Sequence, residues 1–139
     1  MQTYDRFASG LNRTATNALG VTATEAGYTR GSNWLDTVLA VIRGNYDYLK
    51  RELNEKVPEI TVCALEGTYL VLMDLRQLIA PEETEHFIQE RCRLAVDYGE
   101  WFGEHFKGFV RLNLATSPEN VQQAVASIIH EAEKVRAGS

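Results

Sequence analysis

Arg111 is the residue whose type and position best suit binding chemistry. It lies in the segment 107–116 (KGFVRLNLAT). Alternation predicts a strand with two faces, one carrying Val110, Leu112 and Leu114 and the other carrying Phe109, Arg111 and Asn113. A guanidinium between apolar neighbours is costly to desolvate unless an anion meets its planar donors, which makes Arg111 a candidate ligand-binding residue. An arginine on the solvated face of an antiparallel sheet produces the same pattern, and both interpretations stay open.

A loop dense in glycine and aromatic residues precedes this strand, over residues 99–108 (GEWFGEHFKG). Its aromatic side chains, Trp101, Phe102 and Phe106, are more than a turn requires, so they could line a cleft or a contact surface. The alternative is that they fold back on the core as a local cluster. The sequence does not separate these two arrangements.

Other motifs with chemical meaning are few. The histidines, His86, His105 and His130, are scattered without an HExxH motif or a nearby cysteine, so no metal site is predicted. His105 is retained as a candidate because it lies in the aromatic loop. The sequence contains no GxSxG, P-loop or GxGxxG motif, which argues against the common hydrolase, phosphate-binding and dinucleotide-binding sites.

Composition narrows the class of protein. The 139 residues are 45% hydrophobic and 24% charged, which suits one globular domain, and the net charge of −5 argues against a nucleic-acid partner. No apolar run approaches the ~20 residues that span a bilayer, and residues 1–10 lack the apolar segment of a secretory signal. We therefore expect no membrane association and a cytoplasmic location. Cys63 and Cys92 form no CxxC pair and are expected to be buried or half-buried thiols.

Helical and strand-like segments alternate after residue 31. Periodicity and capping signals predict three helices: a long one over 32–56, one that opens at Pro81, and a closing one that opens at Pro118 after Ser117 as N-cap. Strands are predicted at 60–63, 69–75, 94–98 and 107–116. Segment 69–75 (YLVLMDL) is apolar on both faces, which is typical of a central strand covered on each side. The order predicts an α/β two-layer sandwich, with a mainly antiparallel sheet of about four strands and helices on one face.

Residues 1–31 show only weak periodicity, with short helices predicted over 4–11 and 15–28. A fold that began here would be expected to open with a clearer pattern. This segment has the character of a chain entered partway through a larger fold.

Three stretches resemble one enzyme family in residue type and spacing: 23–53 (AxxAGY…WL…GN), 66–76 (EGTYL…D) and 99–125 (GxxFG…GFVRLN). Together they resemble the carboxy-terminal third of class I/II aminotransferase-like enzymes that use pyridoxal 5'-phosphate (PLP). The most similar branch is that of the cystathionine β-lyase-like carbon–sulfur lyases. The resemblance extends from about residue 17 to the end of the chain.

The resemblance implies roles for several residues. Arg111 corresponds to the arginine that binds the α-carboxylate of the amino-acid substrate, through the two donors of its planar fork. Gly99, Trp101, Phe102 and Gly103 correspond to residues that line the cleft without acting in catalysis. No catalytic residue is expected in this chain.

The same resemblance predicts that the chain lacks its cofactor-binding half. The family holds PLP with a lysine, an aspartate at the pyridine nitrogen, a stacking aromatic residue and a phosphate-binding loop, all upstream of the matching region. Lys50, Lys56, Lys107 and Lys134 stand in none of these contexts. PLP is therefore expected in the intact parent enzyme and not in the isolated chain.

The sequence thus predicts a residual large-domain segment over 1–31 and a small carboxy-terminal domain over 32–139. The intact enzyme would catalyse β-elimination from cystathionine-like amino acids or transamination, and this chain alone would be inactive. Its expected partners are the amino-acid substrate, the missing PLP-binding large domain and a second copy, because exposed apolar surface favours self-association. The alternative is a free-standing small-molecule-binding or protein-interaction module that kept the fold without catalysis.

Overall fold

The computed structural model describes residues 2–10 and 17–138 and divides the chain into two compact units, Met1–Thr37 and Val38–Ser139. The first unit contains α1 (Gln2–Gly10) and α2 (Ala18–Arg30). Asn17 caps α2, because its side-chain oxygen accepts a hydrogen bond from the amide of Leu19 at 2.9 Å. The two predicted short helices are therefore present, although residues 11, 15 and 16 of those predictions lie outside the described residues.

The long predicted helix is α3 (Ser32–Lys56), and the division between the two units falls within it. Its buried residues begin at Ile42, whereas Leu35 and Leu39 are exposed. The buried Asn45 amide donates hydrogen bonds to the carbonyls of Leu114 and Thr116, at 2.9 and 3.0 Å. These bonds fasten α3 to the segment that follows the central strand.

Four antiparallel strands form one sheet in the order β1-β2-β4-β3. They are β1 (Thr61–Val62), β2 (Leu70–Asp74), β3 (Asp97–Tyr98) and β4 (Phe109–Asn113), each shorter than the predicted segment. The predicted faces of β4 are confirmed: Val110, Leu112 and Leu114 are buried, whereas the alternate residues are partly or fully exposed.

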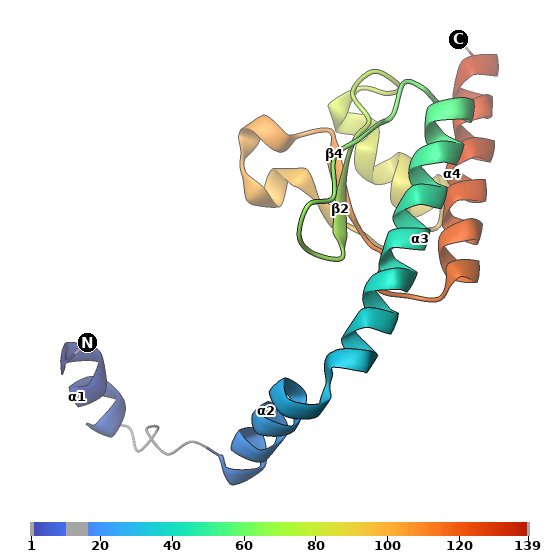
Figure 1. The fold of residues 1–139 in the computed structure, drawn as a ribbon. Helices are drawn as coiled ribbons and strands as arrows, with labels where there is room; N and C mark the ends of the chain where they lie inside the picture. Colours follow the sequence, from blue (N-terminus) through green and yellow to red (C-terminus); the bar gives the residue numbers. More distant parts are fainter. Residues whose placement is uncertain (1, 11–16, 139) are drawn as a thin grey trace. The chain divides into compact units, whose positions relative to one another are not determined.

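The inner face of the sheet packs against α3 and α4 (Pro118–Ala137), which lie side by side in Figure 1. The core contains buried residues from both helices and both central strands, among them Leu49, Leu53, Val71, Met73, Val110, Val125 and Ile128. The predicted α/β sandwich is therefore confirmed, with an antiparallel sheet and a long helix near its start.

The predicted helix that opens at Pro81 is present, but it is not a regular α-helix. It begins as a 3₁₀ turn, η1 (Pro81–Glu83), and continues as a π-helix, η2 (His86–Arg91). The wider turn buries the adjacent residues Phe87 and Ile88 together with Cys92, whose amide donates a hydrogen bond to the Phe87 carbonyl at 2.9 Å.

Among the described helices, none has the length and apolarity to cross a membrane.

The outer face of the sheet is only partly covered by the described residues. On β2, Val71 and Met73 are each 1% exposed on the inner face, whereas Leu70 and Leu72 on the outer face are half-buried. The sequence predicted that something covers this second face. Within residues 38–138 no α-helix covers this face, which also carries Arg111.

Candidate functional site

The candidate site lies on the outer face of the sheet, around Arg111 in the middle of β4. Arg111 is paired with Leu72 of β2 on one side and with Asp97 of β3 on the other. Antiparallel pairing directs these cross-strand neighbours to the same face. The sheet register therefore brings a carboxylate next to the predicted binding arginine.

Asp97 occupies only one edge of the Arg111 guanidinium. Both Nε and Nη2 donate to the same carboxylate oxygen, Oδ2, at 3.0 and 2.7 Å. Nη1 of Arg111 and Oδ1 of Asp97 have no hydrogen-bond partner among the described residues, and the arginine side chain is 33% exposed. The Nη1/Nη2 edge therefore has no partner among the described residues at Nη1, and two donors on one such edge match the two oxygens of a carboxylate.

Phe102 fixes the plane of the same guanidinium. Its ring centroid lies 4.3 Å from the guanidinium carbon, within the range of a cation–π contact. Phe102 belongs to η3 (Gly99–Phe102), so the aromatic loop contributes directly to the surroundings of Arg111. A stacked ring on one face and a carboxylate on one edge restrict the orientation of the side chain.

A second aspartate–arginine–phenylalanine group on the same face provides a comparison. Arg76 donates Nε to Oδ1 of Asp74 at 2.8 Å and Nη2 to Oδ2 at 2.7 Å, with the Phe109 ring 4.5 Å from its guanidinium carbon. The side-chain hydrogen bonds from Arg76 lower the pKa of Asp74. Here both carboxylate oxygens are engaged, whereas Asp97 uses only Oδ2; in both pairs the arginine donates through Nε and Nη2 and leaves Nη1 without a hydrogen-bond partner among the described residues.

The four residues predicted to line a cleft differ in their exposure to solvent. Trp101 and Phe102 are 64% and 45% exposed, and Trp101 contacts the Tyr98 ring edge-on at 5.6 Å. Gly99 is buried where a Cβ would meet the Phe106 carbonyl oxygen, and Gly103 has φ +138°, so both positions favour glycine. Of the two alternatives for the aromatic loop, the exposure of Trp101, Phe102 and Phe106 favours a surface over a buried cluster.

The histidines do not join this site. His86, His105 and His130 are all exposed, and the described residues contain no cluster of three or more potential metal-binding side chains. His105 lies in η4 (Glu104–Phe106), close in sequence to the aromatic loop, but it makes no hydrogen bond with the described residues. It therefore gains no role from the structure.

The lysines of this chain do not fit a PLP site by themselves. Such a site needs an ε-amine free to bond the cofactor and a group that holds its phosphate. Each lysine amine instead donates to a neighbour: Lys50 to the Tyr46 hydroxyl at 3.2 Å, Lys56 to Glu52 at 2.8 Å, Lys107 to Glu82 at 2.8 Å and Lys134 to Glu131 at 2.6 Å. The glutamate hydrogen bonds raise the pKa values of Lys56 and Lys107, which keeps these two amines protonated.

Sequence reasoning did not identify Asp97 as a partner of Arg111. The predicted strand 94–98 contains it, but only the register of a two-residue strand places it opposite Arg111. The signal in the sequence is an acidic residue in one predicted strand and an arginine without an assigned partner in the following predicted strand. Without the strand order, that signal does not select Asp97 over the other acidic residues.

Most of this chain is similar to one part of several longer known proteins. No family model matches. The chain is 31% identical over 121 residues to protein MalY of Escherichia coli K12, covering 86% of this chain and 31% of MalY. It is 26% identical over 127 residues to the cystathionine beta-lyase PatB of Bacillus subtilis 168, covering 88% of this chain and 33% of PatB.

The structure comparison agrees with the sequence comparison. The chain superposes on cystalysin from Treponema denticola, whose crystal structure contains pyridoxal 5'-phosphate, with a TM-score of 0.83 and 29% identity. The match covers 94% of this chain and 34% of cystalysin. The chain thus spans about a third of the length of the relatives it matches. Its homologues are cystathionine β-lyases and PLP-dependent aminotransferase-like enzymes, and it corresponds to one third of such an enzyme, consistent with the carboxy-terminal part.

Proposed function

We propose that this chain is the substrate-carboxylate-binding domain of a PLP-dependent carbon–sulfur lyase or aminotransferase, and that Arg111 binds the α-carboxylate of the amino acid. The observation that carries the proposal is the partly exposed Arg111 side chain in the middle of β4, whose Nη1 has no hydrogen-bond partner among the described residues. A two-point pair between this edge and a carboxylate fixes the orientation of the substrate as well as its position.

The neighbours of Arg111 support this role. Asp97 holds the Nε/Nη2 edge and leaves the Nη1/Nη2 edge directed away from β3. Phe102 covers one face of the guanidinium and reduces its contact with water. Because water competes for the same donors, partial desolvation strengthens the pair that Arg111 forms with a carboxylate.

The cofactor would be held by residues outside this chain, because each lysine of this chain donates a hydrogen bond to a neighbouring side chain. When bound, PLP supplies the electron sink for reactions of amino acids. We assign residues 1–31 to the cofactor-binding domain and residues 32–139 to the small domain. The half-buried Leu70 and Leu72 beside Arg111 fit a surface that the cofactor-binding domain or a second copy covers.

The proposal is tested by combining this chain with the sequence encoded before it, expressed as a separate protein. The expected result is that the mixture gains the visible absorbance of bound PLP and releases a thiol from cystathionine-like substrates or transfers their amino group. The 139-residue chain alone is expected to do neither. The matched control is the same mixture with Arg111→Lys, which should keep the absorbance and lose substrate affinity.

Three outcomes would count against the proposal. If the chain alone binds PLP and turns over substrate, the proposal that a separate domain holds the cofactor is wrong. If the mixture binds PLP and reacts equally well with Arg111→Lys, the carboxylate-binding role is wrong. A chain that neither pairs with the upstream protein nor alters its absorbance would favour the free-standing binding module.

A further inference from the structure

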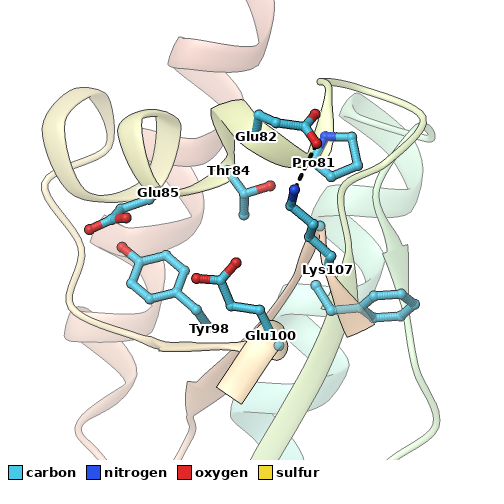
Figure 2. Close-up of a pocket in the computed structure, with 10 residues that line it drawn as sticks. Pro81, Glu82, Thr84, Glu85, Tyr98, Glu100 and Lys107 are labelled. Atoms are coloured by element: carbon cyan, nitrogen blue, oxygen red, sulfur yellow. Dashed lines mark hydrogen bonds and ion pairs between the residues drawn. The ribbon is translucent and has the colours of Figure 1, made fainter. Parts of the chain in front are cut away.

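A second site lies in a cavity of about 250 Å³ between the η1 segment and the start of η3. Its wall carries Glu82, Thr84 and Glu85 from one segment, Tyr98 and Glu100 from another, and Lys107 from the approach to β4. Figure 2 shows these side chains around one space, with Glu85 and the Tyr98 hydroxyl on one side and the Glu82–Lys107 pair on the other. This cavity plays no part in the proposed binding of a substrate carboxylate.

The cavity carries an excess of negative charge. Lys107 neutralises Glu82 through a hydrogen bond of 2.8 Å, whereas Glu85 and Glu100 have no ion-pair partner among the described residues. The one ammonium of the wall, that of Lys107, is paired with Glu82, so the charges of Glu85 and Glu100 stay in excess. The partner that this charge favours is a cation.

An unpartnered buried hydroxyl gives a second, independent indication of a ligand. Thr84 is 4% exposed, and its Oγ1 makes no hydrogen bond with the described residues. Buried polar groups are nearly always paired, and leaving one unpaired costs free energy. In Figure 2 the Thr84 hydroxyl is directed into the space bounded by Lys107 and Glu100.

The chemistry of the wall selects an ammonium group over a metal ion. The described residues contain no group of three or more carboxylate, thiol or imidazole side chains placed to bind a metal. The hydroxyls of Thr84 and Tyr98 and the carboxylates of Glu85 and Glu100 can each accept a hydrogen bond from an N–H donor. Burial raises the pKa of Tyr98, with Glu85 and Glu90 adding to the shift, so its hydroxyl stays neutral.

We propose that this cavity binds the protonated amino group of a small alkyl amine, with Glu85 and Glu100 supplying the charge and Thr84 accepting a hydrogen bond. The amine would enter as its ammonium form, and no bond is made or broken. Its alkyl part would extend along the Phe109 side of the cavity.

The test is a titration of the full 139-residue chain with propylammonium chloride, followed by backbone amide NMR signals. Propan-1-ol provides a neutral ligand of the same shape, and tetramethylammonium provides the charge without an N–H donor. We expect saturable shifts at residues 84, 85 and 98–100 with propylammonium, and binding about fivefold weaker or more with both comparison ligands.

Three variants complete the design. Glu100→Gln removes a wall carboxylate, Thr84→Val removes the buried hydroxyl at nearly constant shape, and Glu133→Gln removes the same charge from α4, away from the cavity. Glu100→Gln and Thr84→Val are expected to weaken binding by about fivefold or more, whereas Glu133→Gln should leave it within about twofold. The dispersed amide spectrum of each variant verifies that it is folded.

The proposal is overturned if propylammonium causes no saturable shift, which would mean that the cavity holds water only. It is also overturned if the three variants bind alike, since that would reflect the general negative charge of the chain. Equal binding of propylammonium and tetramethylammonium would remove the role of the N–H donors and with it the proposed site.

Discussion

Replacing Arg111 by lysine distinguishes two contributions of this residue: its positive charge and its ability to orient the substrate carboxylate. Lysine keeps the positive charge at this position of β4 but presents a compact ammonium in place of a planar fork. It can therefore attract the substrate carboxylate without holding both of its oxygens. The prediction concerns the enzyme assembled from this chain and its cofactor-binding partner.

The expected loss follows from the hydrogen bonds involved. A hydrogen bond to a charged group contributes about 1.5–3 kcal/mol, and the low end applies because Arg111 is 33% exposed. A loss of about 1.5 kcal/mol corresponds to a change of about tenfold in an equilibrium constant. We expect the KM for the amino acid to rise by about tenfold or more, with the PLP absorbance unchanged.

The assay is steady-state kinetics with a cystathionine-like substrate, next to a spectrum of the bound cofactor. Arg76→Lys is the matched control, because Arg76 has the same surroundings of one aspartate and one phenylalanine but lies after the end of β2 and not in the middle of β4. Its KM should stay within about twofold of the unmodified enzyme. Equal KM values for Arg111→Lys and the unmodified enzyme would refute the reasoning, as would equal increases for both variants.

Three further predictions concern the folded chain itself. Asn45→Ala removes the amide that donates to the Leu114 and Thr116 carbonyls after β4. It should lower the free energy of unfolding by about 2 kcal/mol in urea titrations, and an unchanged midpoint would contradict this. Hydrogen bonds from Lys134, then Arg91, lower the pKa of Glu131, so its stabilisation should be complete above an ordinary carboxyl pKa of about 4.3 and disappear as the pH falls through the lowered value. Glu131→Gln should therefore destabilise the chain near neutral pH and not in strong acid, as measured by unfolding at a series of pH values. Burial raises the pKa of Cys92 to about 12, so iodoacetamide at about pH 8 should modify Cys92 only after unfolding, as detected by mass spectrometry.

The parts of the fold that the sequence predicts well are those with a strong period. The alternation in 107–116 correctly assigns the two faces of β4, and the spacing in 32–56 correctly places α3. The same spacing includes Leu35 and Leu39, which lie in turns of α3 that are exposed in this chain. Periodicity identifies a stripe, but not whether a neighbour covers its full length.

The parts that the sequence does not predict depend on contacts between distant segments. The π-helix of η2 leaves no mark in the sequence, because Phe87, Ile88 and Cys92, which are all buried, would also share one face of a regular helix. Similarly, the pairing of Asp97 with the Nε/Nη2 edge of Arg111 depends on the register between β3 and β4, which residue types alone do not give.

The most direct test of the account measures the coupling between Arg111 and a substrate carboxylate. In the assembled enzyme, inhibition constants are compared for L-alanine and for ethylamine, which lacks the carboxylate, with and without Arg111→Lys. The account predicts that the substitution weakens inhibition by L-alanine about tenfold or more and leaves ethylamine unchanged, giving a coupling of about 1.5 kcal/mol. If both inhibitors weaken by the same factor, Arg111 does not bind the carboxylate and the central claim is contradicted.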